Sequence, residues 1–236
     1  MQFQISQRKI INDFILESRG FSKLLVLLPG FAFDYKIFSF LDLPFDYLYP
    51  RSLITIDAID RLKELLLDIR HNFKAIYLLG WSLGGNIALL LYKDIPFVFS
   101  SISLVSIRNK YLREDISKQI SMLREDHDKM LKDFYRKCFL GQKSFFYWFR
   151  HHLEKEYLYK FSTAKLIRQL TFLENDSIEL SYIKTRLLLF HGKRDIIAPL
   201  DDIPEIPYGA KRFILKSASH IPFLDTRFTK LFLENI

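Results

Sequence analysis

The sequence predicts an α/β protein with a mostly parallel central sheet flanked by helices, and a helical lid inserted before the last two strands. Apolar runs without alternation, such as 23–28 and 75–79, are typical of parallel strands that are buried on both faces. Amphipathic segments of helical spacing alternate with these runs, except in one long stretch of different composition. We therefore expect residues 1–108 and 183–236 to form the α/β core and residues 109–182 to form the helical lid.

Composition narrows the class of protein. With 236 residues, of which 49% are apolar, the chain can bury a sizeable core. The single cysteine, Cys138, excludes an internal disulfide and fits a reducing compartment. We see no signal peptide and no apolar run long enough to span a bilayer, so we expect a cytoplasmic protein without an integral membrane segment.

The net charge of +8 favours acidic partners. No zinc-ligand spacing, phosphate-binding glycine loop or nucleic-acid module is visible, so we expect no metal, no cofactor and no nucleic acid.

The expected elements follow one another as such a core requires. Residues 1–22 fit either a helix or one or two edge strands. The next segments predict a strand at 23–28, a short helix at 35–41, a short strand at 45–49, an amphipathic helix at 53–71, a strand from 75, a helix at 83–92 and a strand at 97–107. After the lid, strands at 185–190 and 211–216 and a closing helix from about residue 226 complete the core.

One pentapeptide lies at the centre of this pattern. Gly80-Trp81-Ser82-Leu83-Gly84 follows a strand and begins a helix, which is the context of a nucleophile elbow. We expect Ser82 to have a strained backbone, with glycines where a Cβ would collide with the neighbouring strand or helix. The N-terminus of the helix would direct its positive dipole end at the serine.

A serine hydroxyl needs a base to accept its proton, and the base needs an orienting acid. With a nucleophile elbow, these residues occur along the chain in the order serine, acid, histidine. Asp195 follows the strand at 185–190 and is the best acid candidate, with Asp201 and Asp202 as alternatives. His220 is the only histidine after Asp195. The predicted catalytic residues are therefore Ser82, Asp195 and His220.

An oxyanion formed in such a reaction needs two backbone donors. The first is expected to be the N–H of Leu83, the residue after the nucleophile. The second is expected to be the N–H of Phe31, in the loop after the strand at 23–28, where Gly30 lets the backbone approach the substrate.

These residues resemble a known family. The motifs that carry the resemblance are Gly80-Trp81-Ser82-Leu83-Gly84-Gly85, His191-Gly192-x-x-Asp195 and His220-x-Pro222-Phe223-Leu224. They are similar to the α/β-hydrolase superfamily over residues 23–107 and 183–236, and within it most similar to the BioH-like pimeloyl-[acyl-carrier-protein] methyl ester carboxylesterases of biotin biosynthesis. In one departure, such enzymes often carry His-Gly-Trp where this chain has Pro29-Gly30-Phe31.

The resemblance implies an α/β-hydrolase fold and a serine carboxylesterase that hydrolyses the methyl ester of a pimeloyl chain on an acyl carrier protein. It also implies substrate-binding roles for Phe31, Trp81 and Phe134. Two alternatives stay open: a broader carboxylesterase or thioesterase for small acyl substrates, and a ligand-binding protein with a silenced hydrolase fold.

The predicted lid is basic and aromatic. Residues 129–168 contain ten Lys or Arg against three Asp or Glu. On one continuous helix, Leu123 and Phe134 would share an apolar face, and Lys129, Lys132 and Arg136 would lie towards the other. This basic face fits a solvated cap, a docking surface for an acidic carrier protein, or contact with an anionic membrane or nucleic acid. The family resemblance favours the carrier protein.

Overall fold

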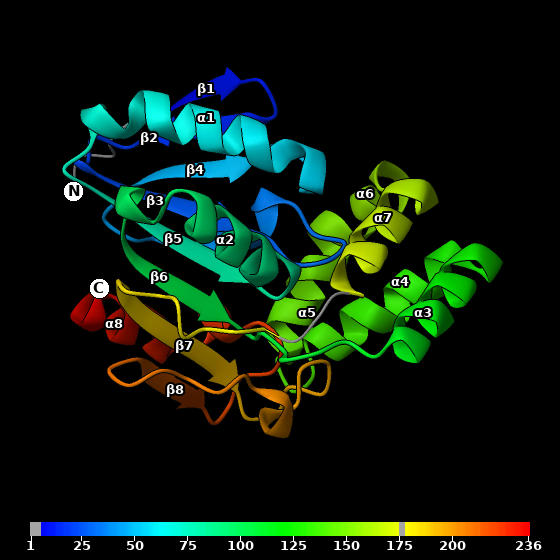
Figure 1. The fold of residues 1–236 in the computed structure, drawn as a ribbon. Helices are drawn as coiled ribbons and strands as arrows, with labels where there is room; N and C mark the ends of the chain where they lie inside the picture. The colour runs from blue at the N-terminus through cyan, green and yellow to red at the C-terminus, as the bar shows by residue number, and fades with distance from the viewer. Residues whose placement is uncertain (1–5, 175–177) are drawn as a thin grey trace.

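The computed structural model describes residues 6–174 and 178–236, and its centre is an eight-stranded sheet (Figure 1). The strands are β1 (Gln7–Ile11), β2 (Phe14–Ser18), β3 (Lys23–Leu28), β4 (Asp46–Pro50), β5 (Ala75–Trp81), β6 (Phe99–Val105), β7 (Arg186–Gly192) and β8 (Lys211–Leu215). Their order in the sheet is β1-β2-β4-β3-β5-β6-β7-β8. Strand β2 pairs antiparallel with both β1 and β4, and the five other pairs are parallel. The predicted mostly parallel sheet is confirmed.

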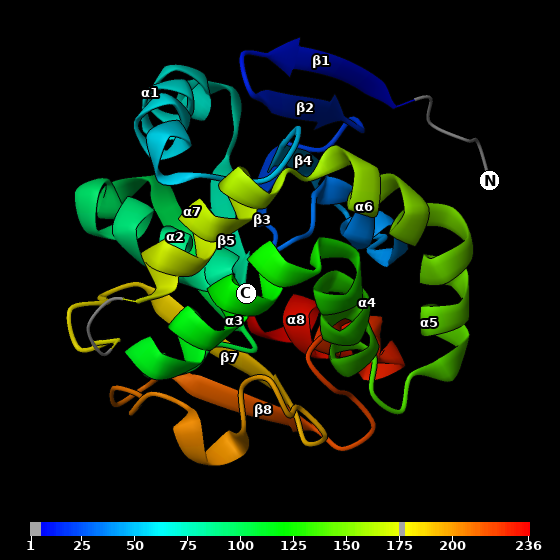
Figure 2. The ribbon, with the colours of Figure 1, turned by 90° about the vertical axis from the view of Figure 1, so that its right-hand side faces the viewer.

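Three helices cover the two faces of the sheet. Helices α1 (Ile59–Ile69) and α2 (Leu83–Asp94) lie on one face, and α8 (Thr226–Asn235) lies on the other (Figures 1 and 2). The strands between these layers are almost completely buried. In β3, for example, every residue from Leu24 to Leu28 is at most 1% exposed. This double coverage explains why the strand sequences are continuous apolar runs.

In the described part of the chain between β6 and β7 there are five α-helices. They are α3 (Arg113–Glu125), α4 (His127–Cys138), α5 (Lys143–Phe149), α6 (Lys155–Lys160) and α7 (Thr163–Leu173). We call residues 109–182 the insertion. Its helices gather at the carboxyl ends of the parallel strands, the edge at which ligands bind in open α/β sheets (Figures 1 and 2). The predicted helical segment before the last two strands is confirmed.

The structure decides one alternative that the sequence left open and corrects two predictions. Of the open segment 1–22, the part from residue 7 forms the β1–β2 hairpin, and residues 1–5 lie outside the described ranges. The amphipathic helix expected at 53–71 is shorter, because α1 begins at Ile59. The helix expected to carry both Leu123 and Phe134 is two helices, because the Asp126 carboxylate caps α4 by accepting the Lys129 N–H at 2.9 Å.

In the described ranges, no helix combines the length and the hydropathy that crossing a membrane requires.

Candidate active site

Ser82 lies at the sharp turn from β5 into α2. Its backbone has φ 52° and ψ −120°, a strained conformation for a residue with a Cβ. A Cβ at Gly84 would lie 2.1 Å from the Leu28 carbonyl oxygen, so only glycine lets α2 approach the end of β3. The strained turn expected at Ser82 is present.

Three buried side chains from distant parts of the chain meet here in a row. The Ser82 Oγ lies 3.0 Å from His220 Nε2, and His220 Nδ1 lies 2.8 Å from Asp195 Oδ2. Ser82 is 4% exposed, Asp195 6% and His220 1%. Because an ionised carboxylate only accepts, Nδ1 carries the proton and Nε2 is free to accept from the serine hydroxyl. This is the geometry of a nucleophile, a base and an orienting acid.

Asp195 is fixed in the loop after β7 by its own backbone. Its Oδ1 accepts the N–H groups of Ile197 and Ala198, both at 2.9 Å, which leaves Oδ2 for His220. Burial alone would raise the pKa of Asp195. The charge and hydrogen bond of His220, the Ala198 N–H and the nearby His191 outweigh burial, and the pKa lies below its usual value. Asp195 is therefore an anion throughout the neutral range.

A second histidine supports the same loop. His191 ends β7, and its Nε2 lies 2.5 Å from the Ala198 carbonyl oxygen and 3.5 Å from Asp195 Oδ2. Burial lowers the pKa of His191, so the neutral ring donates its Nε2–H to the carbonyl. His191 thus stabilises the Asp195 loop through a hydrogen bond and adds no positive charge beside the Asp195 carboxylate.

A cavity of about 280 Å³ opens above Ser82. Phe31 and Phe134 form one wall, with their ring centroids 5.1 Å apart in an edge-to-face arrangement. The other apolar lining residues are Ile116, Met122, Met130, Leu170, Leu173, Ile196 and Ile197. Charged side chains also line the cavity: Arg108, Asp115, Lys118, Asp133 and Lys137. The cavity above the serine therefore combines apolar walls with charged side chains.

The residues expected to supply the two backbone donors, Leu83 and Phe31, lie close to the serine. Leu83 is the first residue of α2, so its N–H has no acceptor within the helix. Gly30 lies against the nucleophile, because a Cβ there would be 3.3 Å from the Ser82 Cβ. The loop that carries the Phe31 N–H therefore passes directly beside the serine.

Comparison with known proteins decides the family. No family model matches the chain. A pimeloyl-[acyl-carrier protein] methyl ester esterase from Wigglesworthia glossinidia brevipalpis is 30% identical over 246 residues, covering 92% of this chain and 83% of that protein. The chain belongs to this esterase family. It is a carboxylic ester hydrolase.

Solved structures agree with this family in fold. An esterase from Exiguobacterium antarcticum has a TM-score of 0.78 at 20% identity, covering 94% of each chain. The enol-lactonase from Burkholderia xenovorans LB400 has a TM-score of 0.76 at 17% identity, covering 97% of this chain and 98% of its own. The fold of this esterase is the α/β-hydrolase fold.

Not every predicted site residue reaches the cavity of the esterase. Trp81 is fully buried and does not line the cavity. Its indole Nε1–H donates to the His220 carbonyl oxygen at 2.6 Å, so the side chain holds the histidine loop from behind. Asp202, an alternative acid, lies 2.8 Å from Arg108 Nε and not beside a histidine.

Sequence reasoning missed two polar residues that follow β6. Arg108 and Tyr111 both line the cavity together with Ser82. The Tyr111 hydroxyl is buried, and burial raises the pKa of Tyr111 to about 12, so the phenol stays protonated. Neither residue belongs to a recognisable motif, and only their place after a strand that neighbours β5 indicates the cavity.

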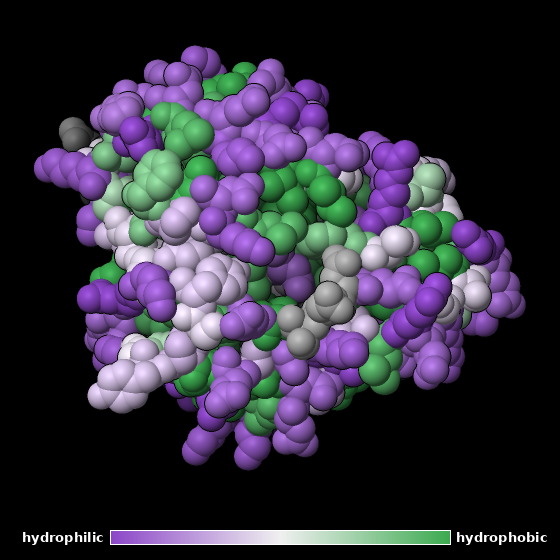
Figure 3. Space-filling view, viewed as in Figure 1, coloured by the Kyte–Doolittle hydropathy of each residue, from purple (hydrophilic) through white to green (hydrophobic). Residues whose placement is uncertain are grey.

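A second hollow, of about 520 Å³, lies on the other side of α7. Leu83 and Ile87 of α2, Ile54 before α1, and Ile167 and Phe172 of α7 contribute to it. It is visible as an apolar depression in the surface in Figure 3. It contains none of the three side chains in the row, so the smaller cavity is the candidate active site.

The residues expected to dock a carrier protein lie on the outer side of α4. Lys129, Lys132 and Arg136 are exposed. Arg136 pairs with Asp133 at 2.6 Å, whereas Lys129 and Lys132 form no ion pair with any described residue. In residues 6–174 and 178–236, no cluster of three or more His, Cys, Asp or Glu side chains is placed to hold a metal ion.

Proposed function

We propose that the protein hydrolyses the methyl ester of a pimeloyl chain carried by an acyl carrier protein, through acyl transfer to Ser82. The observation that carries the proposal is the buried row of Ser82, His220 and Asp195 at the base of a cavity that has an aromatic wall. Membership of an esterase family whose relative from Wigglesworthia glossinidia brevipalpis is named for this substrate supports the substrate class.

The reaction proceeds in two steps. His220 takes the proton of Ser82 as the oxygen attacks the ester carbonyl, and Asp195 stabilises the resulting imidazolium. The N–H groups of Leu83 and Phe31 bind the oxyanion. His220 then protonates the departing methanol, and the acyl group stays on Ser82. Water, activated by His220, attacks this acyl-enzyme, and the carboxylate product leaves.

The surface of α4 supports the carrier as partner. An outer hollow of about 430 Å³ is lined by three cations, Lys132, Arg136 and Arg150, and by Phe146, Asp133 and Glu154. Asp133 lines both this hollow and the cavity above Ser82, so the two adjoin at α4. An acidic carrier bound to these cations would lie close enough to direct its acyl chain into the cavity.

The test is direct incubation of the purified protein with the methyl ester of a pimeloyl-carrier conjugate. Methanol release by the wild type, and none by Ser82→Ala, is the expected result. No methanol from the wild-type protein would rule the proposal out. Growth of a strain that lacks its own pimeloyl esterase, restored by this gene, is the corresponding test in cells.

A broader carboxylesterase or thioesterase is the second candidate. The ion pairs of Arg136 and Lys137 with Asp133, both at 2.6 Å, favour it, because they leave less free positive charge for a carrier. Fast turnover of short p-nitrophenyl esters, together with no preference for carrier-bound substrate, would identify this activity.

A further inference from the structure

The insertion grips the loop that follows β3 from two sides at one residue. The Ala32 N–H donates to Gln169 Oε1 of α7 at 3.2 Å, and the Ala32 carbonyl oxygen accepts the Tyr135 hydroxyl of α4 at 3.0 Å. Gln169 is 2% exposed and Tyr135 is fully buried. Gln169 is itself fixed, because its Nε2 donates to the Ile54 carbonyl oxygen at 2.9 Å. These two side chains, Gln169 and Tyr135, form what we call the Ala32 clamp.

The residue that the clamp holds has an unfavourable backbone. Ala32 has φ 58°, in the left-handed region, where its Cβ crowds the neighbouring carbonyl oxygen. Such a conformation persists only when the surroundings determine it. Two hydrogen bonds from the insertion, one to the N–H and one to the carbonyl oxygen of Ala32, hold the backbone in this conformation.

The next residues of the loop are held by the insertion as well. The Asp34 carboxylate is fully buried and accepts the Tyr157 hydroxyl and the Lys160 ammonium group, each at 2.6 Å. Both partners lie on α6. The loop thus has a second anchor two residues after Ala32, and its shape depends on three different helices of the insertion.

The loop matters because of what precedes Ala32. The Phe31 N–H is the proposed oxyanion donor, and a Cβ at the preceding Gly30 would come within 3.3 Å of the Ser82 Cβ. Gln169 fixes the peptide that joins Phe31 to Ala32, which is the peptide directly after the donor. The Phe31 Cα joins this peptide to the one that carries the Phe31 N–H, so a displacement of the held peptide would move the Phe31 Cα and shift the donor with it.

We propose that Gln169 and Tyr135 are positioning residues that aim the Phe31 N–H at the oxyanion, so that the insertion completes the oxyanion site. This inference rests on the proposed acyl transfer at Ser82. It gives the insertion a role in the chemical step, in addition to covering the cavity. A misdirected donor weakens binding of the transition state and leaves ground-state binding of a small ester almost unchanged.

Two variants test the clamp. Tyr135→Phe removes one oxygen and keeps the ring, and Gln169→Leu removes both hydrogen bonds at similar volume. We expect each to lower kcat for p-nitrophenyl acetate about tenfold, with KM changed less than twofold. Tyr182→Phe is the matched control: its hydroxyl also donates to a backbone carbonyl, that of Leu89 at 3.2 Å, but away from the cavity, and it should keep wild-type kcat.

Binding of phenylboronic acid provides a readout that a loss of packing alone would not change. The boron atom bonds to the serine oxygen, and one oxygen of the tetrahedral adduct then occupies the oxyanion site. Both clamp variants should bind phenylboronic acid about tenfold more weakly than the wild type, while Tyr182→Phe binds it normally. Thermal unfolding shows whether each variant folds. If Gln169→Leu does not fold, the result for Tyr135→Phe, which is the smaller change, tests the inference.

The outcomes separate the two proposals. If Ser82→Ala is inactive but both clamp variants keep wild-type kcat and phenylboronic acid affinity, the clamp inference is overturned and the proposed function stands. If Ser82→Ala itself keeps esterase activity, the proposed acyl transfer fails, whatever the clamp variants do.

Discussion

The sheet edge and the insertion contribute to one cavity in different ways. Loops at the carboxyl ends of the strands carry the row of Ser82, Asp195 and His220, and each member is buried and hydrogen-bonded. The insertion contributes apolar walls on its inner side and basic residues on its outer side. The contrast teaches that the core carries the groups proposed to make and break bonds, whereas the insertion supplies much of the surface that a substrate would meet. Changes at the sheet edge should therefore reduce kcat for every ester, and most changes in the insertion should discriminate between esters.

The largest effect is expected at the nucleophile. Ser82→Ala should lower kcat by about 10⁴-fold or more for small and carrier-bound esters alike, because no hydroxyl remains to form the acyl-enzyme. Steady-state kinetics and circular dichroism would measure activity and fold. Ser103→Ala, a buried serine of β6 outside the cavity lining, is the control and should stay active. Equal losses in both variants would show that the effect is not specific to Ser82.

Asp195→Asn should lower kcat by about 10³- to 10⁴-fold, because the histidine loses the carboxylate that orients it. Asp201→Asn, the alternative acid on the same loop, should keep wild-type kcat. Wild-type kcat in Asp195→Asn together with a large loss in Asp201→Asn would show that Asp201 is the acid that orients His220.

The same substitution has a consequence for stability. The pKa of Asp195 is lowered in the folded state, so its carboxylate stabilises the fold fully above the ordinary value of 3.8. This contribution is lost as the pH falls through the lowered folded pKa. Urea unfolding should therefore find a difference between wild type and Asp195→Asn that is constant near neutral pH and shrinks below about pH 4. A difference that grows on acidification would contradict the lowered pKa.

A smaller, selective effect is expected on the inner side of the insertion. Phe134→Ala removes a wall of the cavity and should lower kcat/KM about tenfold for long-chain p-nitrophenyl esters, with less than a twofold change for the acetate. Phe213→Ala, a partly buried aromatic of β8 that stacks on Phe190, controls for lost aromatic packing and should not discriminate by chain length. An equal loss for both chain lengths would remove Phe134 from the substrate site.

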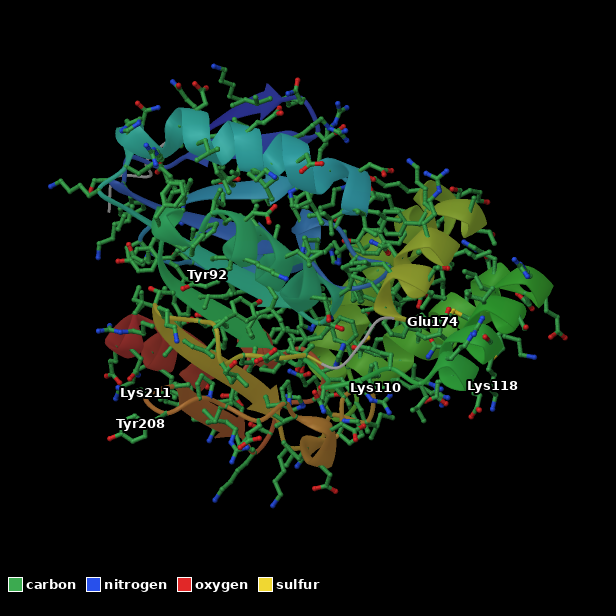
Figure 4. All side chains as sticks on the ribbon, in the orientation of Figure 1. Tyr92, Lys110, Lys118, Glu174, Tyr208 and Lys211 are labelled. Atoms are coloured by element: carbon green, nitrogen blue, oxygen red, sulfur yellow. The ribbon has the colours of Figure 1, made fainter. Side chains whose placement is uncertain are left out.

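The smallest effect is expected on the outer side of the insertion. Reversing charge at Lys132 and Arg136 together should raise KM for the carrier-bound ester several-fold at low salt, and the difference should shrink as salt is added. Small esters should be unaffected. Lys74 and Lys211 are exposed at the amino ends of β5 and β8 and provide a matched double reversal. Figure 4 shows Lys211 at the end of the sheet opposite the insertion. An equal rise in KM in this control would show that only the net charge of the protein matters, and not the position of the charges on α4.

The core was predictable because its signals are local. Gly80 to Gly84 carry the turn, and Asp195 and His220 follow strands in the order that the elbow requires. Trp81 is next to Ser82 in the sequence, but it does not line the cavity. Neighbouring residues at the end of a strand point to opposite faces, so the indole lies behind the site.

The insertion was less predictable for two physical reasons. The helical period runs on through Asp126, so the pattern did not reveal that this residue caps a new helix. The contacts of Gln169 and Tyr135 with Ala32 span 137 and 103 residues of sequence, and such contacts leave no local pattern. The division of the chain into a core and a lid at residues 108 and 183 remains a prediction.

The central claim is that the hydroxyl of Ser82 is the attacking group, and covalent labelling tests it most directly. Wild-type protein would be treated with a fluorophosphonate probe, digested and analysed by mass spectrometry. We expect a single adduct, on the peptide that contains Ser82, and slower labelling of the His220→Ala variant. No adduct, or an adduct on another serine with Ser82 unmodified, would contradict the account.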